Sequence, residues 1–262
     1  MARADETANS GVPTGGAAGG AAGGPAGASS AWPARCLLRA ARSGALASQA
    51  DGQPFASLVT PATAPDGAVL LLLSDLAEHT RHLRADPRCA VLVSGPPQGA
   101  NPQTTPRLTV TGTAEPTDDP ALLARYLAIH PYAGLYAGFG DFHVWRLAPA
   151  AGLLVGGFGR AARLRAASLL PDPVAVAAVA AAEAALMAEA NRTHRSLLAR
   201  LAGAAEGVAR EVVAIDVDGC DVAPAAAGEP PDAEPPATVR ISWSAPLRAP
   251  EDVRREWARL AA

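Results

Sequence analysis

The stretch "PFASLVTPATAPDGAVLLLLSDLAEHTRHLRADPRCAVLV", residues 54–93, places a short polar helix between two apolar strand signals. The first signal, residues 67–74, is an apolar run that is too short to cross a membrane and suits a strand buried on both faces. The second signal covers residues 88–95, and Pro87 ends the helix between the two. The stretch therefore predicts a strand, a helix and a strand, with most of its chemically reactive side chains on the helix.

Further strand signals lie on both sides of this stretch. The sequence predicts strands at residues 44–50, 54–62, 67–74, 88–95, 106–117, 141–150 and 151–159. The first two flank "DGQ", a glycine-containing hairpin turn. The strand at 106–117 alternates apolar residues such as Leu108 with polar residues such as Thr109, which is typical of a half-buried strand. Short strands separated by short helices predict an antiparallel barrel rather than a parallel βαβ sheet.

Helix signals and a low-complexity segment complete the N-terminal part. Residues 1–30 are rich in glycine and alanine, carry almost no large side chain and are predicted to form a disordered tail. The segment "AWPARCLLRAARSG", residues 31–44, predicts a helix. A second helix is predicted at residues 118–131, with Asp118 or Asp119 as its N-cap.

The pattern changes after the linker "LLPDP", residues 169–173. The sequence beyond it predicts a long helix, two strand signals around a loose loop, and a last helix. We therefore predict a split-barrel domain at residues 31–168, followed by a small α+β C-terminal domain at residues 169–262. The predicted fold class is α+β and mainly β, an antiparallel split β-barrel with short helices.

Composition excludes several classes of protein. The chain has 262 residues, 49% of them apolar, and a formal net charge of -3, so it has no long-range attraction for nucleic acids or acidic membranes. No apolar run approaches the roughly 20 residues that cross a bilayer, and no secretory signal is recognisable. The cysteines are widely spaced and number 3, which is typical of buried thiols in a reducing compartment. We therefore expect a cytoplasmic protein without a nucleic-acid or membrane partner.

The polar helix that follows Ser74 has the features of an anion site. Asp75 is the expected N-cap, and Glu78 is the residue expected to reach back to it. His79, Thr80 and Arg81 then occupy the first turns, where unpaired amides and the helix dipole attract phosphate. The opposing interpretation is a solvated helix face whose own acidic residues already satisfy those amides. The local pattern leaves both interpretations open.

The order of motifs along the chain resembles a known family. A His-Thr-Arg helix is followed by "DPR", by the strand "RLTVTG" and by two Gly-Phe-Gly motifs at residues 136–142 and 155–161. This order resembles the FMN-binding split barrel of the pyridoxamine 5'-phosphate oxidase superfamily, in particular its branch of HugZ-type heme oxygenases. A C-terminal domain of unassigned function is typical of that branch, and the turn at residues 214–222 is similar to one in that domain.

The resemblance implies a set of cofactor contacts and a quaternary structure. The residues that would contact FMN are Ser57, Ser74, His79, Thr80, Arg81, Arg107, Gly157 and Phe158. Arg160 would lie on the substrate side. Because the flavin of this superfamily usually sits between two subunits, a homodimer is implied. We predict no catalytic side chain, since the flavin carries the redox chemistry, and no metal site, since no cysteine or acidic cluster completes the pair of His79 and His82.

One stretch departs from the family pattern. The stretch that matches the family's His-Met-Asn-x-Asp-His motif is "EANRTH", residues 189–194, in which Asn191 and His194 remain. No histidine follows His194 in this sequence, so a heme oxygenase that takes its iron ligand from a C-terminal histidine would find none. The departure weakens the prediction of heme degradation more than that of flavin binding.

Three functional hypotheses follow from these features. The leading one is a flavin-dependent oxidoreductase whose FMN passes electrons between a reductant and heme or another planar small molecule. The second is a non-catalytic module that binds heme or a protein partner in tetrapyrrole metabolism. The third is a degenerate barrel without a ligand. The sequence leaves FMN, a deazaflavin and heme open as ligands, because flavin and deazaflavin need phosphate donors in similar places.

Overall fold

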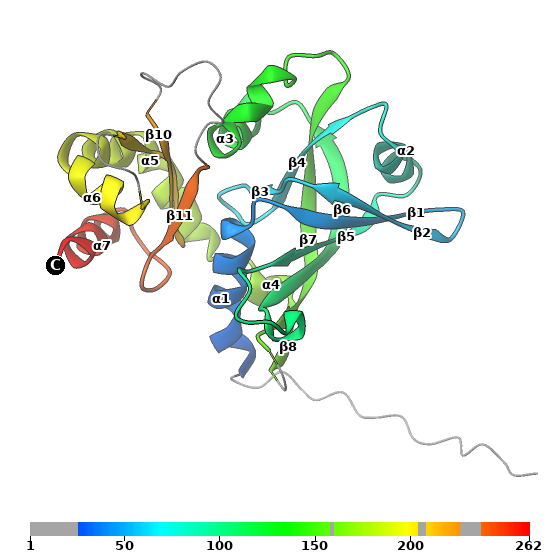
Figure 1. Ribbon diagram of the computed structural model, residues 1–262, viewed down its shortest axis with the longest axis horizontal. Helices are drawn as coiled ribbons and strands as arrows, with labels where there is room; N and C mark the ends of the chain where they lie inside the picture. Colours follow the sequence, from blue (N-terminus) through cyan, green and yellow to red (C-terminus); the bar gives the residue numbers. More distant parts are fainter. Residues whose placement is uncertain (1–25, 158–159, 204–207, 226–236) are drawn as a thin grey trace, which may run out of the picture.

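The computed structural model describes residues 26–157, 160–203, 208–225 and 237–262. Within these residues an antiparallel barrel is joined to a smaller unit of strands and helices, which lies to one side of the barrel (Figure 1). The predicted α+β class, with a split barrel followed by a small α+β domain, is confirmed.

The barrel is one antiparallel sheet whose strands do not follow sequence order. Its strands are β1 (Gly44–Ala50), β2 (Gln53–Val59), β3 (Ala62–Thr63), β4 (Val69–Ser74), β5 (Arg88–Ser94), β6 (Arg107–Thr117), β7 (Phe142–Val155) and β8 (Ala161–Arg165). They pair in the order β2-β1-β5-β6-β7-β4-β3, and β8 adds to β7. Because β2 and β3 do not pair with each other, the barrel stays open between them. Buried aliphatic residues such as Leu46, Val110 and Leu147 fill its interior.

The predicted hairpin and strand alternation are present in the barrel. Asp51 and Gly52 join β1 to β2 with positive φ angles of 51° and 81°, as a two-residue hairpin turn requires. In β6, Leu108 and Val110 are buried whereas Thr111 is exposed. The local sequence pattern therefore predicted the hairpin turn and the half-buried strand correctly, since burial in the first half of β6 follows a period of two.

One long strand stands where two were predicted. β7 is continuous, so the prediction of separate strands at residues 141–150 and 151–159 is wrong. The strand passes through Pro149 because its partner β6 shifts register beside Gly112, and a proline is tolerated at such an irregularity, where the ladder of hydrogen bonds is already interrupted. β8, which the sequence did not predict, pairs with the last part of β7.

Short helices cover the ends of the barrel. They are α1 (Ala26–Ala40), α2 (Glu78–Ala85), α3 (Pro120–Ile129) and α4 (Ala166–Leu169), with the 3-10 turns η1 (Pro102–Thr104) and η2 (Pro131–Leu135). α1 begins within the predicted tail, so residues 26–30 are helical, whereas residues 1–25 lie outside the described residues. Asp119 caps α3 by accepting a backbone N–H at 2.8 Å, which decides between Asp118 and Asp119.

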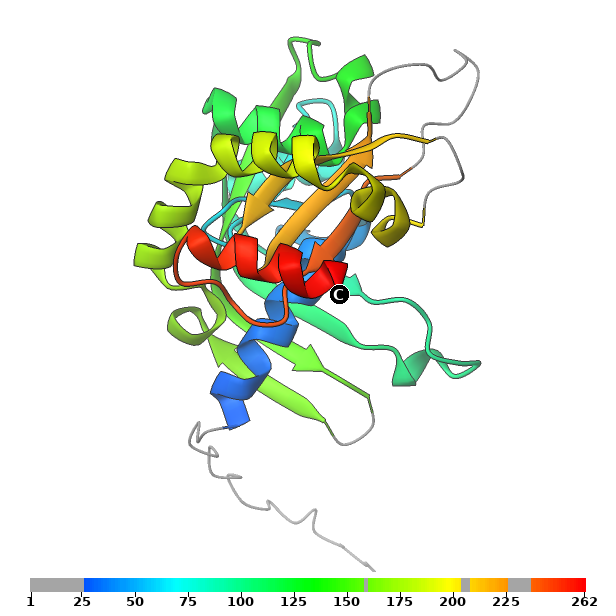
Figure 2. The same ribbon diagram turned by 90° about the vertical axis from the view of Figure 1, so that its left-hand side faces the viewer.

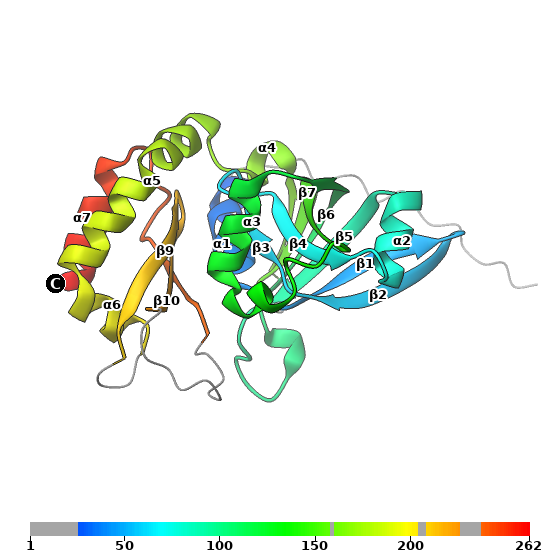
Figure 3. The ribbon, with the colours of Figure 1, turned by 90° about the horizontal axis from the view of Figure 1, so that it is seen from above.

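The C-terminal unit packs three helices on one face of a three-stranded sheet. Its elements are β9 (Arg210–Asp216), β10 (Gly219–Pro224), β11 (Val239–Ser242), α5 (Pro173–Thr193), α6 (Arg195–Leu201) and α7 (Glu251–Ala261). The strands pair in the order β11-β10-β9. Figures 2 and 3 show the helices on the outer face of this sheet, while the other face lies towards α1 and α3. The predicted long helix is interrupted at His194, where α5 ends and α6 begins.

The described part of the chain holds one helix, α5, that is long and apolar enough to cross a membrane by length and composition alone. This differs from the prediction that no apolar segment approaches that size. One face of α5, which includes Val179, Leu186 and Ala190, is buried in the core of the C-terminal unit. This one-sided burial is what a helix packed on the sheet of a folded domain shows.

Buried ion pairs join the barrel side to the C-terminal unit. Asp216 of β9 accepts hydrogen bonds from Arg39 of α1 and Arg125 of α3, each at 3.0 Å. Arg240 of β11 adds a third at 2.6 Å, and Asp218 accepts one from Arg39 at 2.9 Å. Burial raises the pKa of Asp216, but the three arginines outweigh burial and hold that pKa below its ordinary range. The two units are therefore attached through charged groups that water does not reach.

Candidate functional site

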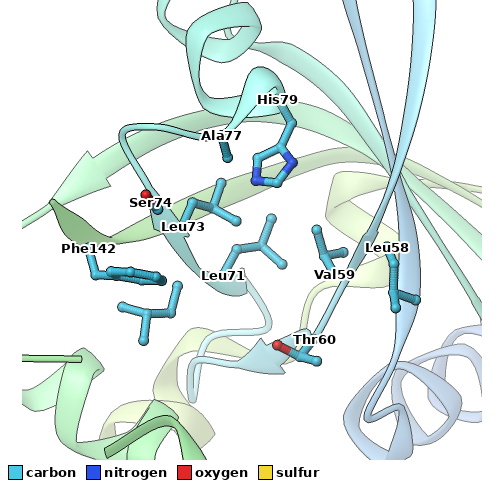
Figure 4. Close-up of a pocket in the computed structure, with 10 residues that line it drawn as sticks. Leu58, Val59, Thr60, Leu71, Leu73, Ser74, Ala77, His79 and Phe142 are labelled. Carbon is cyan, nitrogen blue, oxygen red and sulfur yellow. The ribbon is translucent and has the colours of Figure 1, made fainter. Parts of the chain in front are cut away.

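A cavity of about 260 Å³, the α2 cavity, opens between β2, β4 and the start of α2. Its lining residues are Leu58, Val59, Thr60, Leu71, Leu72, Leu73, Ser74, Ala77, His79 and Phe142. Figure 4 shows that the His79 ring points into it from α2, above the leucines of β4. Polar side-chain atoms come from Thr60, Ser74 and His79 alone among the lining residues. An apolar lining with a few polar groups is the usual character of a small-molecule site.

A second cavity of about 440 Å³, the outer cavity, lies on the exposed side of β1, β2 and β5. Its lining residues are Ser43, Gly44, Ala45, Ala56, Ser57, Leu58, Leu92 and Ser94. Ser57 has a buried hydroxyl that finds no hydrogen-bond partner in the described part of the chain. Leu58 lines both cavities, so the two adjoin at β2.

The start of α2 differs from the predicted N-cap arrangement. Ala77 occupies the N-cap position and offers no capping side chain, so the prediction of Asp75 as N-cap is wrong. The Asp75 N–H bonds to the chain just ahead of β7 at 2.7 Å, which holds this residue in the turn that precedes the helix. Its carboxylate accepts a hydrogen bond from Arg84 at 2.6 Å, and Glu78 pairs with Arg81. The acidic residues of this segment therefore neutralise its arginines.

His79 carries an imidazole without a hydrogen-bond or ion-pair partner among the described residues. Burial lowers the pKa of His79 below its ordinary 6.5, and the nearby His82 lowers that pKa further. His82 itself is engaged, because its Nδ1 lies 3.1 Å from the Ser48 hydroxyl and its Nε2 lies 3.3 Å from Glu78. His79 is therefore a neutral imidazole at pH 7 that faces a cavity.

The other residues of this region that were predicted to contact phosphate either have protein partners or do not line the α2 cavity. The Ser74 hydroxyl donates to Asp141 at 2.5 Å and accepts the Leu76 N–H at 3.1 Å. The Thr80 side chain is fully buried, and its hydroxyl has no partner among the described residues. Arg81 lies exposed at the surface, paired with an acidic neighbour. Neither Thr80 nor Arg81 lines the α2 cavity, so the structure does not assemble the predicted phosphate site there.

Arg107, Gly157 and Arg160 lie at the opposite end of the barrel. Arg107 begins β6 and pairs in register with the last residue of β7, whereas Phe142 of the α2 cavity is the first residue of β7. The 14 residues of β7 separate these positions, and a strand of this length spans roughly 43 Å when extended. The Arg107 guanidinium donates to two carbonyl oxygens near η1 at 3.0 and 3.3 Å. None of the three lines the α2 cavity, and Phe158 lies outside the described residues.

The "EANRTH" segment has partners within the C-terminal unit. The Asn191 side chain donates to the Val212 carbonyl at 3.0 Å and accepts the Val212 N–H at 2.7 Å, which fastens α5 to β9. The His194 ring stacks on Trp257 with ring centres 5.3 Å apart. Both residues therefore support packing. Within the described ranges no group of three or more His, Cys, Asp and Glu residues is placed to hold a metal ion.

Sequence patterns pointed to few of the residues that form the α2 cavity. Leu58 is the neighbour of the predicted Ser57, and Phe142 ends the first Gly-Phe-Gly motif, so both lay beside predicted residues. Their common location depends on the pairing of β4 with β7, which sets Phe142 opposite Ser74. A pairing between strands this far apart in the sequence leaves no local signal.

Comparison with known proteins defines the class of the barrel. Residues 34–156 match the family model described as pyridoxamine 5'-phosphate oxidase. Together with the open antiparallel sheet, this match shows that the barrel is a split barrel of the pyridoxamine 5'-phosphate oxidase type. The predicted resemblance to this superfamily and to its HugZ-type branch is confirmed by this match and by the relatives of the chain.

Three similar proteins illustrate the relationship. The chain is 37% identical over 102 residues to the chloroplastic heme oxygenase HOZ of Arabidopsis thaliana, and the match spans 38% of this chain but 30% of HOZ. The structure of Atu2129 from Agrobacterium tumefaciens, a protein of unknown function, is 26% identical with a TM-score of 0.69, over 88% of this chain and 94% of that one. A heme binding protein from Mycobacterium smegmatis is 26% identical with a TM-score of 0.52, over 92% of this chain and 98% of that one.

Proposed function

We propose that the protein binds heme, with the tetrapyrrole seated in the α2 cavity. The observation that carries the proposal is the chemistry of this cavity, an apolar lining into which the neutral and unpartnered imidazole of His79 points. A porphyrin is planar and mostly apolar, so burying it against aliphatic side chains is favoured by the hydrophobic effect. Polar groups at such a site serve to orient the ligand.

The surface around the α2 cavity extends the proposed site. At about 260 Å³ the cavity lies just below the roughly 300–1,000 Å³ of typical small-molecule sites, so it would hold one part of a tetrapyrrole. Leu58 lines the cavity and Leu76 directly precedes its lining residue Ala77, and these two leucines are 80% and 78% exposed. A macrocycle placed over them would remove large apolar side chains from water.

The charges near the α2 cavity favour a tetrapyrrole over a phosphate ester. The imidazole of His79 is neutral, and the carboxylate of Asp141 holds the Ser74 hydroxyl. Arg81 is paired with Glu78 outside the cavity. A phosphate dianion would have to break these pairs before it gained charge-assisted hydrogen bonds of its own.

The names of two similar proteins support the proposal, because both refer to heme. HOZ is a heme oxygenase, and the Mycobacterium smegmatis protein is a heme binding protein. The second of these covers nearly the whole of the present chain, with an identity of 26%. Because the HOZ match spans 30% of that protein, we propose heme binding for this chain and leave heme breakdown out of the proposal.

Titration of the purified protein with hemin tests the proposal. We expect a Soret band that differs from that of free hemin. Ala77→Phe, which fills the α2 cavity, should abolish this band, whereas the matched change Ala45→Phe, which fills the outer cavity, should keep it. The melting temperatures of both variants establish that they are folded. If Ala77→Phe bound hemin as tightly as the wild type does, the tetrapyrrole would sit elsewhere.

A flavin-dependent oxidoreductase is the second candidate, and Ser57 favours it. Its buried hydroxyl lacks a partner among the described residues, and a buried hydroxyl without a hydrogen bond is costly unless a ligand or water satisfies it. The outer cavity that it lines is the larger of the two, at about 440 Å³. FMN bound there would supply redox chemistry towards a planar substrate. Quenching of FMN or deazaflavin fluorescence by the wild type, but not by Ala45→Phe, would support this candidate; no quenching by the wild type would exclude it.

We also propose that the protein forms a homodimer through the exposed face of β1, β2 and β5. Leu58 and Leu92 are exposed on this face, next to the exposed Ala45. A contiguous apolar face of this kind marks an interaction surface in a water-soluble domain. Arg107 and the α2 cavity lie at opposite ends of β7, so a residue such as Arg107 would contribute to a cavity of this kind only from the second copy.

Leu92→Glu is expected to convert the dimer into a monomer, because the change places a charge in the proposed apolar contact. Sedimentation velocity measures the mass, which for one chain is 26.4 kDa. Leu135→Glu, at an exposed leucine of η2 outside this face, should leave the dimer intact. A monomeric wild-type protein would rule the proposal out.

A further inference from the structure

We infer that His79 is the side chain that ligates the iron of a heme bound in the α2 cavity. The inference rests on the proposed heme-binding function and names the residue that anchors the metal. The cavity itself offers no competing ligand. Of its ten lining residues, His79 alone carries a nitrogen or sulfur donor in its side chain. Histidine nitrogen and cysteine or methionine sulfur are the common protein ligands of heme iron.

The other histidines of the chain are engaged with protein groups. Their partners are Ser48 and Glu78 for His82, the Pro61 carbonyl for His130, Asp75 for His143 and the Trp257 ring for His194. None of these four histidines lines the α2 cavity. His79 has neither a hydrogen bond nor an ion pair nor a ring contact in the described part of the chain, so both of its ring nitrogens are free.

The protonation state of His79 suits an iron ligand. An imidazole binds iron through the lone pair of a neutral ring. Burial, with a smaller contribution from His82, lowers the pKa of His79 below its ordinary value. The neighbouring Glu78 pairs with Arg81, so this carboxylate is engaged away from the His79 ring. Neither this carboxylate nor any other described side chain therefore occupies the His79 ring nitrogens that face the cavity.

The backbone that carries His79 is held in place by packing. α2 buries Thr80, His82 and Leu83 against the barrel, where it packs mainly on β1 and also contacts β2 and β6. His79 stands in the first turn of this helix, and its ring projects into the cavity (Figure 4). A ligand residue on a packed helix is held in position more precisely than one on a loop, so a bound iron would meet the ring without rearrangement of the backbone.

Hemin and metal-free protoporphyrin IX, titrated separately into the wild type, His79→Ala and His82→Ala, distinguish ligation from binding. We expect His79→Ala to bind protoporphyrin as the wild type does, because the apolar lining is intact. It should bind hemin at least about tenfold more weakly, with changed Soret and visible bands. Added imidazole should restore the wild-type spectrum. His82→Ala should keep that spectrum, since its ring contacts Ser48 rather than the cavity.

Each outcome bears on a different claim. If His79→Ala keeps the wild-type hemin spectrum and affinity, the ligand assignment is overturned while heme binding stands. If the wild type binds neither porphyrin, the proposed function fails and the assignment fails with it. His79→Met provides a second variant, because it retains a ligating side chain at this position and should shift the bands instead of giving the spectrum of the alanine variant.

Discussion

Asp216→Ala is expected to lower the free energy of unfolding by about 3–5 kcal/mol, because it removes the carboxylate that three buried arginines share and leaves an excess of buried positive charge. The arginines that share Asp216 are Arg39, Arg125 and Arg240, whose side chains are 1%, 7% and 2% exposed. They reach no water that would replace the lost carboxylate. Urea unfolding measures the change, followed by tryptophan fluorescence because the Trp243 Nε1 donates to the Asp216 carbonyl.

Arg254→Ala is the control for this experiment. Arg254 pairs with Glu189 at the surface, and exposed ion pairs contribute little, so the unfolding curve should superimpose on that of the wild type. Asp216→Asn, which keeps one acceptor oxygen, should fall between the alanine variant and the wild type. If Asp216→Ala were as stable as the wild type, these ion pairs would not be what holds the C-terminal unit on the barrel.

Gly112→Ala is expected to destabilise the barrel by about 3 kcal/mol or more, because overpacking against a rigid neighbour is among the costly core changes. A β-carbon at this position would lie 2.0 Å from the Ala148 carbonyl oxygen and 3.0 Å from the Leu147 side chain. The nearer obstacle is backbone, so no rotation of a side chain removes it, and β6 would have to separate from β7. The last residue of the "RLTVTG" motif therefore has a steric role.

The yield of soluble protein and its melting temperature measure the effect of Gly112→Ala. Gly138→Ala is the matched control, because a β-carbon there would meet no heavy atom within 4 Å. We expect this control to melt as the wild type does. Equal melting temperatures for both variants would mean that β6 and β7 can separate at Gly112 without cost, contrary to the register of this pair.

Local patterns predicted most strands of the barrel, because burial alternates along strands such as β5 and β6 and the apolar run of β4 is buried throughout. They failed where a distant partner decides the outcome. β7 stays continuous through Pro149 because β6 is irregular beside it, and Asp75 is held outside the N-cap position of α2 by the hydrogen bond from its N–H to the Asp141 carbonyl. Neither cause is visible within a few residues of its effect.

Local sequence patterns did not predict how the C-terminal unit is attached to the barrel. The sequence around Arg39 shows only a polar position of α1, because its partner Asp216 lies 177 residues further along the chain. Arg35 and its partner Asp218 are separated by 183 residues. Such pairs form only once the fold is complete. The cytoplasmic location and the absence of nucleic-acid and membrane partners rest on composition and stay predictions.

The candidate site was predicted in part. The helix that follows Ser74 was singled out, and His79 does line a cavity, but the expected phosphate contacts of Thr80 and Arg81 do not. The two side chains are unavailable to a phosphate in the α2 cavity for different reasons. Thr80 is buried, and Arg81 pairs with Glu78 at the surface. The same helix therefore presents an imidazole to an apolar cavity rather than a cluster of cations to a phosphate.

Absorbance titration of the wild-type protein with hemin tests the central claim most directly. Heme binding in the α2 cavity predicts a Soret band that saturates at one hemin per chain, with the spectrum of iron ligated by an imidazole. A spectrum that stays that of free hemin throughout the titration would contradict the proposed function, and the ligand role of His79 would be lost with it.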